Sequence, residues 1–516
     1  MPVGGQSIPM LEYDMAPGIS KTFRKEFLAL GDFAKLFDEN NRKRVDEYLQ
    51  CSISEDESIL GEQGKKKIFE ILASADREIL VWTWDTALKN TDSKTYQACE
   101  AFIHNLNTMS SRAGAQVPFS SVNYGTGTTP EQRMVMLNML KALDAGLGNG
   151  ETQIFPIHVF KVKKSVNLDE GTPNHDLFKL ACKVASRRLF PTFVFEDAPF
   201  NKVFYKEGDP NTEVATMGCR TRVVANVHGQ PTTEGRGNLS FTTINLPRLA
   251  IESEGNAIVF MDKVKSVADD VIQQLLERFE VQARRKVYNY PFLMGQGVWR
   301  DSEKLHENDE VREVIKHGTL TLGFIGLAEA MVALFGKHHG QDKNVASYAY
   351  DVVKSLRKVC DDATEKYQLN FSLIATPAEG LSGRFTRMDR KKFGIIQGVT
   401  DREFYTNSMH VPVYFPISIW KKIDIEAPYH ELCNGGHISY VELDGDVSKN
   451  PEAFEAVIKY MADAGIGYGA VNVPVDFDPV CGYTGVIGDT CPRCGRKDGE
   501  KVSAERIHEL RKKYHR

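Results

Sequence analysis

Two periodicities alternate along the chain, one typical of helices and one of buried strands. Apolar residues recur at three- and four-residue steps, which predicts amphipathic helices, in residues 129–146, 175–189, 260–279 and 345–367. Short apolar and β-branched runs predict strands at residues 154–162, 190–195, 239–246 and 370–375. Residues 21–100 read as helical and polar. Strands that alternate with helices in this way predict an α/β protein.

The start of the first of these helices has its own signature. Thr129 can cap the helix, Pro130 suits the first helical position, and Gln132 completes a capping box. We expect this helix to stop near Gly146. The glycines that follow, up to Gly150, come after a helix and not after a strand, so they do not predict a dinucleotide-binding fold.

Composition narrows the classes of protein. A hydrophobic fraction of 42% over 516 residues can fill a large core, and a net charge of −5 offers no basic surface for a long nucleic acid. Mean hydropathy is −0.33, and the sequence predicts neither a membrane span nor a signal peptide. Nine cysteines, an odd number, fit a reducing compartment better than a disulfide framework. We therefore expect a cytoplasmic protein that binds neither nucleic acid nor membrane.

Composition changes near Pro474, where a cysteine- and glycine-rich tail begins. We expect two domains, a catalytic portion at residues 1–473 and a zinc-ribbon-like tail with a final helix at residues 474–516. In the tail Cys481, Cys491 and Cys494 have the spacing of two zinc knuckles, and Asp478 stands where a fourth ligand would fall. The alternative is a metal-free loop.

Cys219 is the most informative of the other cysteines. It lies in Met217-Gly218-Cys219-Arg220-Thr221, which resembles the tip of a loop between strands. No histidine accompanies it, so the residues alone favour a structural thiol over a nucleophile.

Several segments in order resemble one family. They are Arg112-Ala113-Gly114-Ala115-Gln116, Met217-Gly218-Cys219-Arg220-Thr221, Gly235-Arg236-Gly237-Asn238, Asn245-Leu246-Pro247-Arg248, Gly323-Phe324-Ile325-Gly326, Thr376-Pro377-Ala378-Glu379-Gly380 and Tyr405-Thr406-Asn407-Ser408. The set is similar to the class III anaerobic ribonucleoside-triphosphate reductases, which are glycyl radical enzymes. The resemblance implies a ten-stranded α/β barrel around a central finger loop, here incomplete.

The resemblance also implies roles for residues. Cys219 would become the thiyl radical that abstracts the ribose 3′ hydrogen of a ribonucleoside triphosphate. Met217 and Asn238 match positions typical of the branch that uses formate as reductant. Thr376, Pro377, Ala378, Glu379 and Gly380 match a loop that binds substrate phosphate. The residues alone allow either an anion site at a helix N-terminus or an ordinary strand-to-helix turn at that loop.

The chain departs from the family pattern at both ends. Gly4-Gly5-Gln6-Ser7 already resembles a segment from inside the barrel, and nothing after Cys494 fits the glycyl-radical loop. Val480-Cys481-Gly482-Tyr483 superficially resembles the radical-glycine motif, an alternative to the zinc knuckle there. We therefore expect an oxidoreductase whose glycyl radical, installed by an iron–sulfur S-adenosylmethionine activating enzyme, is on another chain. Nucleotide effectors and a homodimer are further expected partners. The alternative functions are a non-catalytic nucleotide-binding or assembly subunit of a split reductase and, less in keeping with the charge, a zinc-ribbon nucleic-acid binder.

Overall fold

In the computed structural model the chain is described for residues 5–109, 117–148, 150–218, 220–443, 447–472, 476–478, 480–485, 487, 490–497 and 500–514. The chain divides into two compact units. Unit 1 comprises Met1–Pro9, Phe193–Val441 and Val457–Ala470. Unit 2 comprises Met10–Thr192, Glu442–Ala456 and Val471–Arg516. Each unit therefore assembles segments that are far apart in the sequence, and the predicted boundary near Pro474 stays a prediction.

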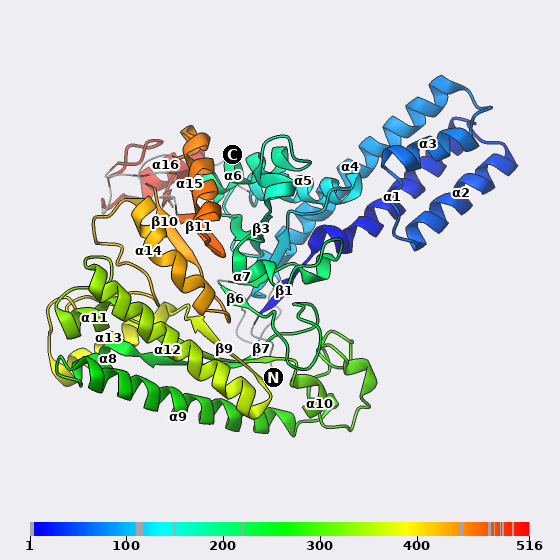
Figure 1. Cartoon of the computed structure of the whole chain (residues 1–516). Coiled ribbons are helices and arrows are strands. Elements are labelled where there is room, and N and C mark those ends of the chain that lie inside the picture. Colours follow the sequence, from blue (N-terminus) through cyan, green and yellow to red (C-terminus); the bar gives the residue numbers. More distant parts are fainter. Residues whose placement is uncertain are drawn as a thin grey trace. The chain divides into compact units, whose positions relative to one another are not determined.

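Unit 1 is built on three parallel strands in the order β7-β8-β9. The strands are β7 (Asn238–Asn245), β8 (Thr319–Ile325) and β9 (Asn370–Ala375). Leu320, Leu322 and Phe324 occupy alternate positions of β8 and belong to a buried apolar cluster. The long helices α9 (Ala257–Ala283) and α12 (Lys343–Tyr367) pack against this apolar face (Figure 1). One face of the sheet is thus closed by helices.

Other elements of unit 1 surround this sheet. The short strands are β1 (Gln6–Ile8), β4 (Thr192–Phe195), β5 (Thr216–Met217), β6 (Thr221–Arg222), β10 (Ser439–Glu442) and β11 (Tyr468–Asn472). The helices are α7 (Pro199–Lys202), α8 (Leu246–Ile251), α10 (Arg312–Ile315), α11 (Leu327–Phe335), α13 (Glu379–Phe393) and α14 (Ile419–Leu432). Helix α15 (Pro451–Asp463) begins in the part of the chain assigned to unit 2 and ends in unit 1. Strands β4 and β11 pair antiparallel, with Val194 opposite Tyr468.

Unit 2 is mainly helical. Its long helices α1 (Leu11–Phe33) and α4 (Arg77–Thr108) lie side by side (Figure 1). Its other helices are α2 (Glu39–Ser54), α3 (Glu62–Ile71), α5 (Pro130–Ala145), α6 (His175–Arg188) and α16 (Ala504–Tyr514). Its strands are β2 (Ser120–Tyr124), β3 (Ile157–Val162), β12 (Asp476–Asp478) and β13 (Tyr483–Gly485). Strands β2 and β3 pair in parallel, and β12 and β13 pair antiparallel.

The predicted mixed α/β class is confirmed, as are the predicted helices and strands. The capping box of α5 is present, because Thr129 accepts from the N–H of Gln132 and Gln132 accepts from the N–H of Thr129. Two strands begin later than predicted, β3 at Ile157 and β4 at Thr192. Each follows a proline, Pro156 or Pro191, which has no N–H to donate to a strand partner. Closure into a ten-stranded barrel stays a prediction.

No described helix is both long and apolar enough to cross a lipid bilayer.

Candidate functional site

A tight hairpin in unit 1 surrounds position 219. Strands β5 and β6 pair antiparallel, with Thr216 opposite Arg222 and Met217 opposite Thr221. Gly218 has a φ of 55°, a conformation that glycine adopts at little cost. Cys219 itself lies outside the described residues. Two strands flank it, as the sequence predicts.

The hairpin lies beside the three-stranded sheet. Thr221 forms a bridge with Gly436, and Gly436 forms another with Ile374 of β9. The N–H of Arg222 donates to the carbonyl oxygen of Gly435 at 3.0 Å. On the far side, Ser7 of β1 donates from its hydroxyl to the carbonyl oxygen of Thr216 at 3.0 Å. The hairpin is therefore level with the last residues of β9.

The sheet face opposite α9 and α12 carries hydroxyl and amide side chains. Asn238 donates from its amide to the hydroxyls of Thr319 (3.0 Å) and Thr321. The hydroxyl of Thr321 pairs in turn with that of Ser372, 3.0 Å away on β9. We call the side chains of Asn238, Thr243, Thr319, Thr321, Ser372 and Thr376 the polar face.

The loop from Thr376 to Gly380 leaves the carboxyl end of β9 and enters α13. Helix α13 does start there, as predicted, and its N-cap Ala378 makes no side-chain hydrogen bond to the first turn. Thr376 is 1% exposed, and Ser408 donates from its hydroxyl to the Thr376 carbonyl oxygen at 3.0 Å. We call residues 376–380 the β9–α13 loop. A helix start without a side-chain cap has N–H groups that suit an anion.

The structure brings only some of the predicted site residues together. Arg220, which follows Cys219, donates to the carbonyl oxygens of Ala375 (3.0 Å) and Thr376 (3.3 Å), so the hairpin contacts the start of the β9–α13 loop. Asn238 pairs with Thr319 at the amino end of the sheet, whereas Thr243 pairs with Gly323 near the carboxyl end. Five residues of strand place Asn238 about 16 Å from Thr243. Asn238 therefore does not reach the β9–α13 loop.

Gly323 makes the carboxyl end of the polar face possible. The hydroxyls of Thr243 on β7 and Thr376 beyond β9 lie 3.1 Å apart, although β8 runs between these strands. They meet because Gly323 of β8 has no side chain. A Cβ at this position would lie 2.0 Å from Oγ1 of Thr376 and 3.1 Å from Oγ1 of Thr243.

A Gly323→Ala variant is therefore expected to break the Thr243–Thr376 hydrogen bond and to lower the free energy of unfolding by about 1–3 kcal/mol. Urea denaturation measures this change. Gly380→Ala is the matched control, since a Cβ there would meet nothing within 4 Å and a helical alanine stabilises. Equal stability of Gly323→Ala and wild type would show that Thr376 moves aside without cost.

A buried carboxylate fixes helix α13. Asp389 is fully buried and accepts from Nδ2 of Asn245 (2.7 Å), Nε of Arg248 (2.6 Å) and the hydroxyl of Tyr405 (2.9 Å). Asn245 also caps α8 by accepting from the N–H of Arg248. Burial, together with the nearby Asp389 carboxylate, raises the pKa of Tyr405 far above its ordinary value, so Tyr405 remains a donor. Asp389 thus holds α13 to α8 and to the segment that leads to Ser408.

Thr243, Thr321, Ser372 and Ser408 were not predicted as site residues. A signal for two of them is present, because residues 319–322 and 370–373 alternate between polar and apolar side chains. Such alternation is typical of a strand with one apolar and one polar face. Ser408 has no comparable signal, since it lies in an irregular segment.

The four predicted metal ligands gather in unit 2. The ligand atoms of Asp478, Cys481, Cys491 and Cys494 all lie within 4.8 Å of one another. The sulfur atoms of Cys481 and Cys491 are 3.7 Å apart, and Cys494 Sγ is 3.4 Å from Oδ2 of Asp478. The N–H of Gly482, which has a φ of 69°, donates to the carbonyl oxygen of Asp478 at 2.8 Å. This geometry is what a knuckle glycine requires.

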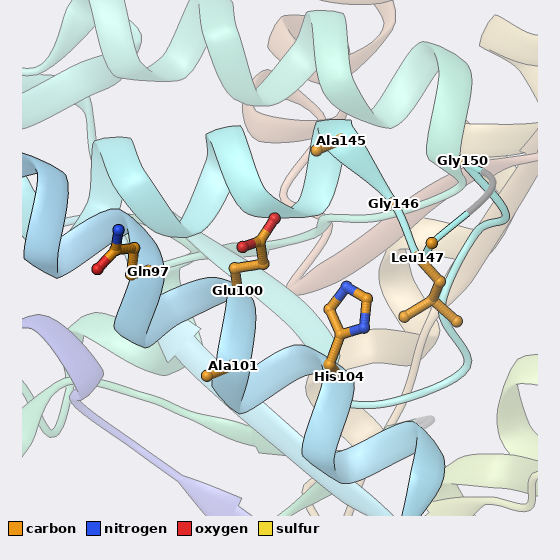
Figure 2. A pocket seen from close by; sticks show the side chains of 9 residues that line it. Gln97, Glu100, Ala101, His104, Ala145, Gly146, Leu147 and Gly150 are labelled. Atoms are coloured by element: carbon orange, nitrogen blue, oxygen red, sulfur yellow. The ribbon is translucent and has the colours of Figure 1, made fainter.

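A separate pocket of about 520 Å³ lies in unit 2 between α4 and the turn after α5 (Figure 2). Gln97, Glu100 and His104 project into it from successive turns of α4, opposite Ala145 and Leu147. None of the predicted site residues lines this pocket.

Comparisons with known proteins agree on one family. A family model described as anaerobic ribonucleoside-triphosphate reductase matches residues 2–508. The chain is 35% identical over 435 residues to the anaerobic ribonucleoside-triphosphate reductase of Escherichia coli (strain K12). The aligned region covers 81% of this chain and 59% of that protein. It is 35% identical to that of Enterobacteria phage T4, over 82% of this chain and 70% of the phage protein. The chain thus spans 59% of the Escherichia coli relative's length.

Solved structures show the same fold. The anaerobic ribonucleotide reductase from Thermotoga maritima in complex with dATP and CTP gives a TM-score of 0.57 at 17% identity, over 83% of this chain and 69% of that one. A glycyl radical enzyme from Archaeoglobus fulgidus gives 0.54 at 12% identity, over 91% and 74%. At such identities the likeness concerns the fold alone.

Proposed function

The chain belongs to the anaerobic ribonucleoside-triphosphate reductase family, and from this premise we propose that it reduces ribonucleoside triphosphates to 2′-deoxyribonucleoside triphosphates. Cys219 is the proposed thiyl-radical site, with Met217 beside it. The observation that carries the proposal is the hydrogen bond from Arg220 to the carbonyl oxygen of Thr376 at 3.3 Å, which joins the hairpin around position 219 to the β9–α13 loop across 156 residues of sequence. A reacting thiol and a phosphate-binding loop have to be neighbours in such an enzyme.

The proposed substrate site uses the β9–α13 loop for the triphosphate. The uncapped start of α13 supports this role, since an anion there would interact with free N–H groups. The Thermotoga maritima enzyme was solved with dATP and CTP, and we propose that this chain likewise takes a ribonucleotide substrate and a deoxyribonucleotide effector. Thr376 through Gly380 are the proposed phosphate contacts.

Formate is the proposed reductant. Its oxidation to carbon dioxide supplies two electrons, and the ribose 2′-hydroxyl leaves as water. Met217 lies half-buried in β5, while Asn238 lies at the amino end of β7, so the two residues would serve the reaction from different elements. The glycyl radical that generates the thiyl radical, the activating enzyme that installs it and a homodimeric assembly are parts of the same proposal.

Zinc is the proposed occupant of the cysteine cluster, and its dimensions fit. With Zn–S bonds of about 2.3 Å, the edge of a tetrahedron is about 3.8 Å. The Cys481–Cys491 separation of 3.7 Å and the Cys494–Asp478 separation of 3.4 Å correspond to such edges. Arg496 donates from Nε to Oδ2 of Asp478 at 3.1 Å and would orient this ligand. The metal would hold the tail together.

The reaction is tested with the complete gene product under anaerobic conditions. After treatment with the activating enzyme and S-adenosylmethionine, CTP and isotopically labelled formate should give dCTP and labelled carbon dioxide in equal amounts. Cys219→Ser should bind CTP as wild type does and form no dCTP. Cys51→Ser is the matched control, because Cys51 is an exposed free cysteine on α2.

Two outcomes would decide against this proposal. Turnover by the Cys219→Ser variant would remove the proposed radical site. Binding of CTP without turnover in every preparation would favour the second candidate, a non-catalytic nucleotide-binding subunit.

A further inference from the structure

Arg220 is a buried arginine in the hairpin that surrounds position 219. It is 3% exposed, and its Nη1 donates to the carbonyl oxygens of Ala375 (3.0 Å) and Thr376 (3.3 Å). The Ser408 hydroxyl is a more distant acceptor at 3.5 Å. Among the described residues no carboxylate forms an ion pair with Arg220. The guanidinium is thus held by neutral oxygens that belong to, or contact, the start of the β9–α13 loop.

The hydrogen-bonding capacity of Arg220 is not exhausted by these contacts. Its Nε is buried and has no hydrogen-bond partner within the described part of the chain. A buried donor without an acceptor costs free energy of folding, and a buried charge without a counter-charge costs more. The Nε of Arg222 is buried without a partner as well, so the two arginines differ in the segments that their guanidinium groups contact.

Arg222, two residues further along β6, provides a contrast. Its guanidinium donates to Oδ1 of Asn201 (2.8 Å) and to the carbonyl oxygen of Asn434 (3.3 Å). The guanidinium of Arg222 therefore contacts segments other than the β9–α13 loop. Its main-chain N–H donates to the carbonyl oxygen of Gly435. Arg222 anchors the hairpin, whereas Arg220 connects it to the loop.

The Thr376 carbonyl is the group through which a bound ligand could change the hydrogen bonds between Arg220 and the β9–α13 loop. It accepts hydrogen bonds from both Arg220 and Ser408, and it lies at the start of the segment that leads into α13. A ligand that binds the loop would reposition Thr376 and with it both donors. Because interior packing is dense, such a shift is transmitted and not absorbed.

We propose that Arg220 is a positioning residue that couples occupancy of the β9–α13 loop to the placement of the hairpin at residues 216–222. The inference rests on the proposed function, in which the loop takes the triphosphate and the hairpin presents the reacting thiol. The coupling would bring the thiol into position only when substrate phosphate is bound. A radical site benefits from this order, because an unoccupied site would expose the radical to side reactions.

The test is amide hydrogen exchange of the complete protein with and without CTP, read by mass spectrometry. In wild type, CTP should slow exchange in both the loop and the hairpin. In Arg220→Lys, CTP should still slow exchange in the loop, while its effect on the hairpin falls by about fivefold or more. Ser408→Ala, which keeps the Arg220 contacts to main-chain carbonyls, should reduce the hairpin response less.

Arg357→Lys is the matched control. Arg357 also donates to main-chain carbonyls, those of Glu431 (3.1 Å) and Leu432 (3.5 Å), but it lies on α12 and does not contact the loop. This variant should keep the full hairpin response. If Arg220→Lys proves too unstable to measure, the Ser408→Ala response decides the question.

The outcomes separate this inference from the proposed function. Protection of the loop by CTP without any change in the hairpin of wild type would overturn the coupling and leave the substrate site in place. An unchanged hairpin response in Arg220→Lys would do the same, as would an unchanged response in Ser408→Ala where Arg220→Lys is too unstable to measure. Absence of protection in both segments of wild type would overturn the proposed phosphate loop and the coupling together.

Discussion

A Cys491→Ser variant is expected to purify without zinc, whereas wild type should contain about one zinc ion per chain. Cys491 is 2% exposed and its sulfur lies 3.7 Å from that of Cys481, so serine removes one of two adjacent soft ligands. Structural zinc contributes apparent free energies of about 10–16 kcal/mol to small zinc-binding folds, so its loss should unfold the tail. Metal content by mass spectrometry and faster amide exchange at residues 480–485 and 490–497 measure the effect.

A substitution at Asp478 is expected to raise the affinity for zinc instead of lowering it. Asp478→Cys would complete a four-cysteine site, which should bind zinc more tightly than three cysteines and one carboxylate do. Competition with a chelator measures the difference. Cys51→Ser, on the exposed surface of α2, should keep the wild-type zinc content. One zinc ion per chain in Cys491→Ser, held as tightly as in wild type, would rule out the proposed ligand set.

An Asp389→Ala variant is expected to lose about 3–5 kcal/mol of unfolding free energy, the usual cost of removing one partner of a buried ion pair. Asp389 is fully buried and receives three side-chain hydrogen bonds, from Asn245, Arg248 and Tyr405. Alanine would leave these donors without an acceptor and Arg248 without its counter-charge. The shift of the midpoint in urea denaturation gives the magnitude.

Two further variants show whether the missing carboxylate is the cause. Asp389→Leu combined with Arg248→Met removes both charges and should recover part of the loss. Asp362→Ala removes the acidic partner of an exposed pair, Lys358–Asp362, and should change stability by at most about 1 kcal/mol. If Asp389→Ala is as stable as Asp362→Ala, the network does not hold α13.

Individual helices and strands could be predicted from the sequence, because capping residues and the spacing of apolar residues within each segment determine them. The cap at Thr129 and Gln132 predicted the start of α5, and apolar spacing predicted α9 and α12. The strand at residues 370–375 was predicted at its observed bounds. Errors occurred at Pro156 and Pro191, where apolar character suggested strand but proline cannot donate a hydrogen bond.

Contacts between distant segments could not be read from the sequence. Arg220 and Ala375 are 155 residues apart, and their hydrogen bond depends on how β6, the Gly435–Gly436 segment and β9 line up. The same holds for Asp389 and its partners on α8 and near Tyr405. The two units likewise combine separate stretches of chain, whereas composition suggested a boundary only at the cysteine-rich tail. The resemblance named the site residues, but only the structure gives the distances between them.

The polar face of β7, β8 and β9 has a consequence for how the protein responds to acidity. Its side chains are threonine and serine hydroxyls and the Asn238 amide, and none of these groups gains or loses a proton between pH 4 and pH 10. No charge therefore appears or disappears on these side chains across that range. The polar face can form hydrogen bonds with a substrate, but it has no acidic or basic side chain that would exchange protons with it. Such a surface suits a reaction that transfers hydrogen atoms instead of protons.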